Sequence, residues 1–217
     1  QVRVDRVRAR LEGTRGAVSA QQERIRAETA AIKAKARLDL DAFVAAFAAG
    51  LPADLEQATA DEVQHYLEPY IRDQFKEWAE QEGDDLAALL ESLAEEIIQI
   101  TNENVRAVLE TLGAQLGAAS TRLAIDFDLF KYDLATVALG AFGTTIFLFV
   151  NMVVGGILTL AAPILAVVLK GRAAEQIKQQ AKLQAPQVIK TAGAALGPKF
   201  DEAIDGFGDR LADFVAQ

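Results

Sequence analysis

The feature that most constrains the fold of this chain is a run of 36 residues, 134–169, without one ionisable side chain. A single helix over the whole run would be about 54 Å long, whereas about 20 residues suffice to cross the roughly 30 Å of bilayer hydrocarbon. One straight spanning helix is therefore a poor fit. Asn151, Gly155 and Gly156 interrupt the run, and such residues end helices and tolerate positive φ. The run predicts a helical hairpin that turns at these three residues, with Pro163 as the alternative break.

The hairpin needs an apolar environment. Ten large apolar side chains occupy the thirteen positions 146–158. At roughly 1.5–3 kcal/mol each, their exposure would forfeit on the order of 15–30 kcal/mol, more than the stability of a typical domain. The arms 134–150 and 157–169 reach roughly 25 Å and 20 Å, so insertion into one lipid leaflet fits better than a full span. The predicted lipid contacts, for each of which packing in a protein core is the alternative, are Phe142, Ile146, Phe147, Phe149, Met152, Ile157, Leu158 and Leu160.

Basic residues flank the apolar run on both sides. Lys131 precedes it, and Lys170, Arg172 and Lys178 follow it. Each Lys or Arg near an anionic lipid surface contributes about 1 kcal/mol to binding. These four residues are therefore predicted to bind lipid headgroups, and the predicted partner is an anionic membrane.

The net charge of -9 conceals a partition along the chain. Residues 1–37 hold ten basic and four acidic groups, residues 38–133 hold five and 21, and residues 134–217 hold seven and six. The acidic middle should be repelled by anionic lipid and so lie away from the membrane. The basic segment has the pattern of a helix that itself needs packing partners, so no nucleic-acid partner is expected.

The composition also indicates the cellular compartment of the chain. The chain has no cysteine, which excludes a disulfide frame, a thiol nucleophile and a thiolate metal site, and suits the cytosol. Its first residues show no secretory signal, and the missing initiator Met indicates a fragment or a processed product. The expected location is the cytoplasmic face of a membrane, with the chain peripheral or monotopic.

Helical periodicity fills the first part of the chain. Apolar residues recur every seven positions, but the positions three residues further on become polar, which favours one helix of a long bundle over a two-stranded coiled coil. This helix is predicted to end at Gly50-Leu51-Pro52. In a second helical region, 53–82, Pro69 is expected to kink the helix or to begin a new one. Gly83-Asp84-Asp85 is expected to end this region and to cap the helix that follows. The seven-residue series is Val4, Leu11, Val18, Ile25 and Ile32, and the apolar face of the second region is Val63, Leu67, Tyr70, Ile71, Phe75 and Trp78.

Two further helical regions follow. From Leu86 an apolar stripe with spacings of three and four continues for more than 30 residues. Beyond the hairpin, 172–190 predicts a helix that ends before Gly193, and a last amphipathic helix carries Phe200, Ile204, Phe207, Leu211 and Phe214. No segment has the period-two alternation of a strand. The predicted fold is all-α, an elongated bundle of long antiparallel helices with an apolar helical hairpin at one end.

Catalytic and cofactor motifs are scarce. His65 is the only histidine, so Glu62 and His65 match just one Glu-x-x-His unit of a di-iron bundle, and a surface histidine is the preferred interpretation. Gly197-Pro198-Lys199 lacks the loop and the hydroxyl of a phosphate-binding motif. Tyr66, Tyr70 and Trp78 have the spacing of core residues rather than of a ligand pocket. The chain is predicted to be no enzyme and to hold neither cofactor nor metal.

The order of these elements resembles that of bacterial dynamin-like proteins and their mitofusin-type relatives. The residues that carry the resemblance are RLAIDFDLFKYDLATVALGAFGTTIFLFVNMVVGGILTLAAPILAVVLKGRAAEQIKQQ, which look like the trunk-to-paddle passage of that family. The resemblance implies a helical trunk over 1–132, a membrane-inserting paddle over 133–170 and return helices over 171–217. It also implies self-association through the trunk. In that family a GTPase head precedes the trunk, so GTP and Mg²⁺ would belong to a parent protein or a partner subunit.

Two other interpretations remain open. A helical pore-forming toxin also hides an apolar hairpin in a bundle and releases it at a target membrane. A membrane-anchored or soluble structural bundle would instead enclose the run in protein, which would need a ring of helices around it.

Overall fold

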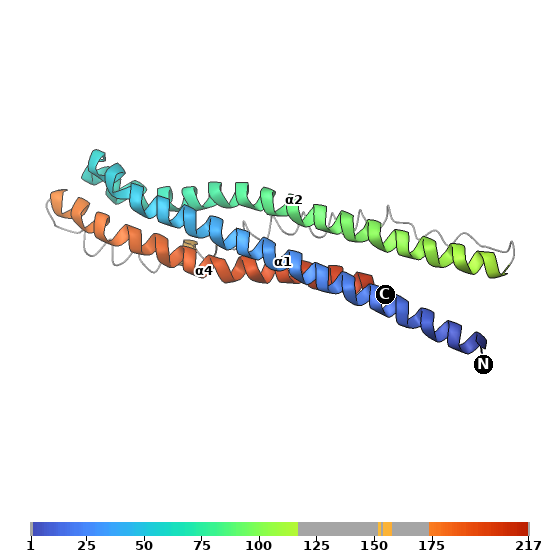
Figure 1. The fold of residues 1–217 in the computed structure, drawn as a ribbon. Helices are drawn as coiled ribbons and strands as arrows, with labels where there is room; N and C mark the ends of the chain where they lie inside the picture. The colour runs from blue at the N-terminus through green and yellow to red at the C-terminus, as the bar shows by residue number, and fades with distance from the viewer. Residues whose placement is uncertain (1, 117–151, 153, 158–173, 217) are drawn as a thin grey trace. The chain divides into compact units, whose positions relative to one another are not determined.

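The computed structural model describes residues 2–116, 152, 154–157 and 174–216. Three long helices are found there: α1 (Val2–Gln57), α2 (Ala60–Leu116) and α4 (Ala174–Ala216) (Figure 1). No strand occurs among the described residues. The all-α prediction is confirmed for them.

The chain divides into two compact units. Unit 1 draws on 1–32, 87–140 and 204–217, and unit 2 on 33–86 and 141–203. Each unit therefore takes a part of α1, of α2 and of α4. The predicted division into trunk, paddle and return helices stays a prediction, because the units group residues by contact and not by their order in the sequence.

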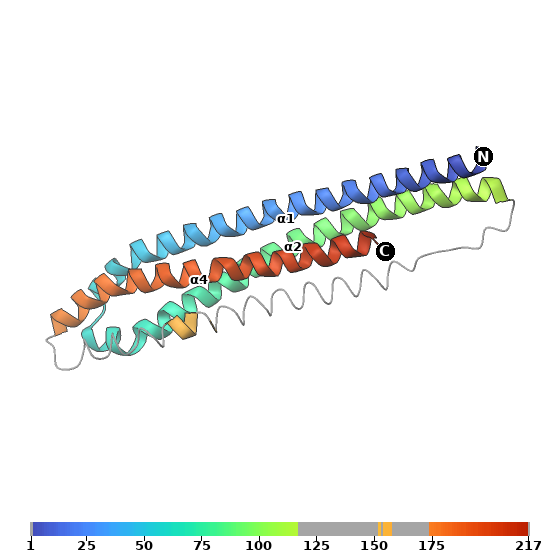
Figure 2. The same cartoon turned by 90° about the horizontal axis from the view of Figure 1, so that it is seen from below.

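In unit 2, α1 and α2 run antiparallel. Lys35 lies against Glu82, and further along α1 the ring of Phe47 meets that of Tyr70, so residue numbers rise on one helix as they fall on the other (Figure 2). Phe75 lies between these levels, with its ring centroid 5.1 Å from that of Phe43. This antiparallel pairing is the one predicted.

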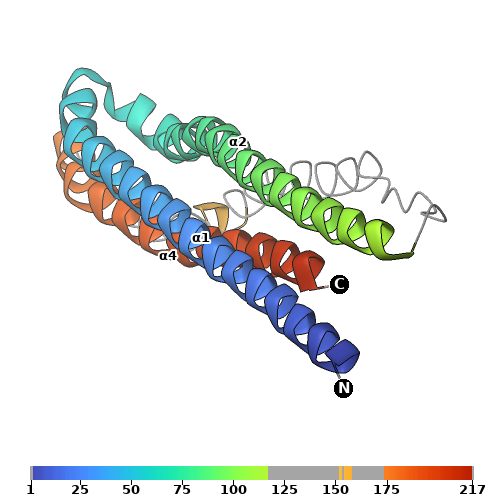
Figure 3. The ribbon, with the colours of Figure 1, turned by 45° about the vertical axis from the view of Figure 1, so that its right-hand side comes forward.

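In the same unit α4 also runs antiparallel to α1 (Figure 3). Arg37 of α1 pairs with Asp201 of α4, and near the other end of this stretch Glu56 accepts a hydrogen bond from Lys182. In unit 1 the two helices run in the same way: Gln22 of α1 donates to the carbonyl of Ala212 in α4 at 3.4 Å, and further along α1 the side chain of Thr29 lies against Gly208.

The buried positions of helix α1 recur at an eleven-residue spacing. Of the predicted seven-residue series, which ended at Ile32, Ile25 and Ile32 are buried and Val18 is partly exposed. Successive buried residues are four, four and three positions apart, which averages about 3.67 residues per turn. This is close to the 3.6 of a straight helix, so no left-handed coiled coil is required. The buried positions are Gln21, Ile25, Thr29, Ile32, Ala36 and Leu40.

Two predicted helix ends are wrong. Helix α1 continues through Gly50 and Pro52 to Gln57, and α2 continues through Gly83. The stripe of buried residues runs on past each break, with Leu51 and Leu55 beyond Gly50 and Leu86 beyond Gly83. A helix glycine costs about 1 kcal/mol and a helix proline about 3 kcal/mol, whereas each buried leucine contributes roughly 1.5–3 kcal/mol. Burial on both sides of the breaker therefore keeps the helix continuous.

The last two predicted helices are one helix. Helix α4 passes through Gly193 and Gly197 without ending. A Cβ at Gly193 would clash with Cγ2 of Val44, and one at Gly197 with the guanidinium of Arg37. These glycines therefore serve the close approach of α1 and α4 and are not helix stops.

Replacing Gly193 with Ala is expected to lower the stability of the protein. Alanine gains about 1 kcal/mol of helix propensity, but its Cβ meets the stiff β-branched side chain of Val44 and forces the helices apart, at a typical cost of 1–3 kcal/mol. The matched control is Gly206→Ala on the same helix, where no atom of the described residues, apart from the adjacent turns of α4 itself, lies within 4 Å of the added Cβ. Urea unfolding should give a lower midpoint for Gly193→Ala and an unchanged or higher one for Gly206→Ala. Stabilisation by both changes would contradict the packing role of Gly193.

Candidate membrane-binding site

Most of the predicted membrane-contacting residues lie outside the described part of the chain. Their roles stay predictions. The described ones are Met152, Gly155, Gly156, Ile157 and Lys178. The ones outside are Lys131, Phe142, Ile146, Phe147, Phe149, Asn151, Leu158, Leu160, Lys170 and Arg172.

The described residues of the apolar run are helical. Gly155 and Gly156 belong to this helical stretch, whereas Asn151 and the flanking residues lie outside the described part of the chain, so the predicted hairpin turn stays a prediction. A helix satisfies each backbone N–H and C=O internally, which an open turn in apolar surroundings does not.

The same stretch presents two different faces. The side chain of Met152 is 63% exposed, whereas Val154 is 0% exposed. Residues two apart on a helix differ by about 200° of rotation and so point to nearly opposite sides. In this short described stretch, Val154 therefore lies on a covered side and Met152 on an exposed side. Among the described residues, no helix has the length and apolar character needed to cross a membrane.

The start of α4, which follows the apolar run, is bonded to the end of α1. Lys178 Nζ donates to the carbonyl oxygen of Glu56 at 2.7 Å, and Lys182 Nζ donates to Oε1 of the same residue at 2.9 Å. The last turn of α1 has no basic residue of its own, and its final carbonyls lack helical partners, so Lys178 supplies the favourable positive charge from α4. The hydrogen bond from Lys182 lowers the pKa of Glu56. Headgroup binding by Lys178 stays a prediction beside this observed bond.

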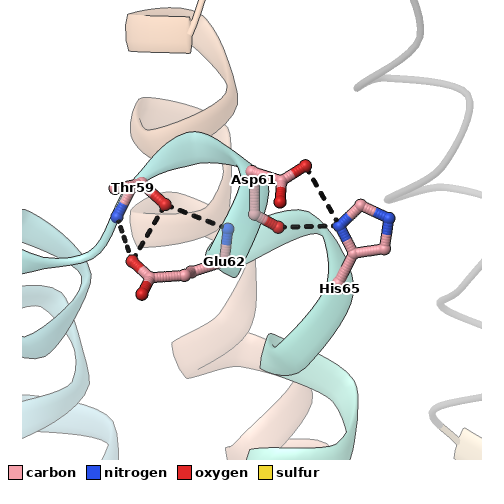
Figure 4. A network of polar contacts seen from close by, with 4 residues as sticks. All are labelled: Thr59, Asp61, Glu62 and His65. Atoms are coloured by element: carbon pink, nitrogen blue, oxygen red, sulfur yellow. Dashed lines mark hydrogen bonds and ion pairs between the residues drawn. The ribbon is translucent and has the colours of Figure 1, made fainter.

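The turn from α1 to α2 lies at Ala58 and Thr59, later than predicted. Thr59 and Glu62 form a capping box (Figure 4): the amide of Thr59 donates to Glu62 Oε2 at 2.7 Å, and the amide of Glu62 donates to Thr59 Oγ1 at 3.2 Å. The bond from the Thr59 amide, together with one from Thr59 Oγ1 to Glu62 Oε2 at 2.9 Å, lowers the pKa of Glu62. The sequence signal was the Thr-x-x-Glu spacing, which the analysis of the sequence missed. The surface position predicted for His65 is confirmed, because its side chain is 60% exposed beside Asp61.

An ion pair that sequence reasoning missed joins α1 to α4. The Arg37 guanidinium donates to both carboxylate oxygens of Asp201, at 3.2 and 2.8 Å. This bond lowers the pKa of Asp201 and raises that of Arg37. Gly197 leaves the space that the guanidinium fills. Gly197-Pro198-Lys199 therefore lies within a packed helix.

Aromatic rings from α1, α2 and α4 pack against one another in unit 2. Trp78 stacks on Phe43 with centroids 5.0 Å apart and meets Phe200 edge-on at 5.7 Å, so one side chain touches α1 and α4. The core positions predicted for Tyr66 and Tyr70 are wrong, because they are 66% and 40% exposed. Both lie off the buried stripe of α2, which follows Val63, Leu67, Ile71 and Phe75.

Within the described ranges, no three His, Cys, Asp or Glu side chains are grouped so that they could hold a metal ion. No protein-family model, curated protein or solved structure matches the chain.

Proposed function

We propose that this chain is the membrane-binding helical stalk of a dynamin-like system and that it inserts the apolar run 134–169 into one leaflet of an anionic membrane. The observation that carries the proposal is the uncharged run itself, with Met152 exposed on the face opposite the covered Val154. A large apolar side chain on an exposed face gains roughly 1.5–3 kcal/mol when lipid replaces water around it. Membrane remodelling belongs to the same proposal.

Charge supports a fixed orientation of the chain at the membrane. The basic residues Lys170 and Arg172 at the edge of the run would meet anionic headgroups, while α2, with 14 acidic and three basic residues, would be repelled. The run would therefore enter the lipid with the acidic helix held away from the surface. Any GTP hydrolysis belongs to a parent protein or a partner subunit.

A second candidate, a pore-forming toxin, is favoured by one observation. Val154 is fully covered, as an apolar hairpin stowed in a water-soluble bundle would require. The two candidates differ in what the chain does to a sealed vesicle, since a pore releases the contents and a stalk does not.

Vesicle flotation combined with dye release tests both candidates. The chain is mixed with dye-filled vesicles of neutral phosphatidylcholine, or of phosphatidylcholine with phosphatidylserine, and floated on a density gradient. The stalk is expected to float with the anionic vesicles, to detach partly at high salt, and to leave the dye inside. Rapid dye release without nucleotide or partner would favour the toxin. Failure to float with either vesicle would overturn both.

A further inference from the structure

Among the described residues, the core buries three polar side chains: Gln21, Thr29 and Glu82. Two of them donate hydrogen bonds within the protein. Gln21 Nε2 donates to Thr101 Oγ1 at 3.2 Å, and Thr29 Oγ1 donates to the carbonyl of Ile25 at 2.8 Å. Glu82 is the exception, and it is also the one that can carry a charge.

Glu82 lies on the face of α2 that meets α1 in unit 2. It is 6% exposed, and its buried Oε1 has no hydrogen-bond partner among the described residues. Lys35 Nζ lies 3.7 Å from Oε1, close enough for an ion pair but too far for a hydrogen bond. That ammonium is instead held by Asp39 Oδ2 at 2.6 Å.

The charges around Glu82 do not balance. Lys35 and Asp39 act on it from α1, and Asp85 acts on it from α2. From α4, Asp201 is already bound to Arg37. Among the described residues named here, the Lys35 ammonium is thus shared by the carboxylates of Glu82, Asp39 and Asp85. A carboxylate that is buried, has an oxygen without a hydrogen bond and lies beside like charges favours its protonated form.

The pKa of Glu82 is raised, mainly by burial and further by Asp39 and Asp85, while Lys35 opposes the rise. The sign of the stability effect follows from this direction. A carboxyl whose folded pKa lies above its unfolded value costs stability when ionised, and that cost disappears as the pH falls through the folded value toward the unfolded one. Acidification below neutrality should therefore stabilise this part of the molecule through Glu82.

We propose that Glu82 is a proton-responsive element in the α1–α2 packing of unit 2: when it takes up a proton the two helices pack more tightly, and when it loses the proton they pack less tightly. The inference is independent of membrane binding. Trp78, the single tryptophan of the chain, lies one turn before Glu82 on the same helix and stacks on Phe43 of α1, so its fluorescence reports on this packing directly.

The test compares Glu82→Gln with the unchanged protein by urea unfolding, followed by Trp78 fluorescence and circular dichroism between pH 4.5 and 8. Gln has the shape of the protonated acid and no charge. At pH 8 the unfolding equilibrium constant of Glu82→Gln should be about tenfold lower, because the variant no longer buries a charged oxygen without a hydrogen bond, a cost of about that size. At pH 4.5, near the unfolded value of about 4.3, the gap should close.

Two further variants make the result specific. Glu77→Gln removes an exposed carboxylate of the same helix and should change the unfolding constant by no more than about twofold at either pH. Lys35→Met removes the ammonium that pairs with Glu82, so it should destabilise the protein more at pH 8 than at pH 4.5. A gap between Glu82→Gln and the unchanged protein that is absent at pH 8, or that stays constant with pH, would overturn the proposal.

Discussion

Replacing both Ile146 and Phe149 with Asp is expected to abolish flotation with anionic vesicles while leaving the helical circular dichroism intact. A charged side chain at the centre of a membrane helix costs about 2.5–3.5 kcal/mol on the insertion scale, and two together cost roughly 5–7 kcal/mol. Since 1.4 kcal/mol is a factor of ten, membrane partitioning should fall by about 10³-fold or more. The measured quantities are the vesicle-bound fraction and the ellipticity at 222 nm.

The matched control adds the same two charges elsewhere. Leu38 and Leu183 are both 69% exposed, so their double replacement by Asp should leave the fold and, apart from weaker attraction to anionic lipid, the flotation unchanged. Loss of helicity in the Ile146 and Phe149 variant, but not in the control, would identify those two residues as protein core. In that case the proposed insertion of the apolar run into lipid would be wrong.

Replacing Phe75 with Ala is expected to destabilise the protein by about 3–5 kcal/mol, the usual cost of removing a buried phenyl ring. Phe75 is 0% exposed and meets the rings of Phe43 and Phe47 edge-on. The change leaves a cavity between α1 and α2 and removes both ring contacts. In a chain of this length each 1 kcal/mol shifts the melting temperature by roughly 2–4 °C, so a fall of roughly 6–20 °C should appear in thermal unfolding.

Tyr66→Ala serves as the control for this change, since it also removes an aromatic ring from α2 but at an exposed position. Its effect on stability should stay within about 0.5 kcal/mol. Equal losses from Phe75→Ala and Tyr66→Ala would mean that the aromatic cluster does not hold unit 2 together. The two variants together therefore separate packing in the core from helix propensity.

The helices and their buried faces were largely predictable, because the spacing of apolar residues is a local pattern that is repeated many times along each helix. Val63, Leu67, Ile71 and Phe75 recur at helical spacing, and each adds the same information about which face is buried. The buried pattern of α4 was visible for the same reason in Phe200, Ile204, Phe207 and Leu211. The exposed position of His65 also followed from its place outside such a stripe.

The helix boundaries were less predictable, because a glycine or a proline can end a helix or can lie inside one that packing keeps continuous. Gly83 and Gly193 look like helix ends in the sequence, yet α2 and α4 pass through both. At Gly193 the deciding fact is the side chain of Val44, which lies about 150 residues away in the chain. The real end of α1 was signalled by the Thr-x-x-Glu spacing at Thr59 and Glu62, a weaker signal than the Gly-Leu-Pro that precedes it.

The helical state of the described residues, and most of the buried stripe of α2 and α4, could be inferred from the amino-acid pattern alone. These properties depend on residues within a few turns of one another. The three-dimensional packing was needed to show that Arg37 binds Asp201 in the space left by Gly197, that Lys178 reaches the end of α1, and that Glu82 is buried beyond hydrogen-bond distance of Lys35. Each of these depends on the register between two antiparallel helices, and helical periodicity fixes the face that packs but not the level at which it packs.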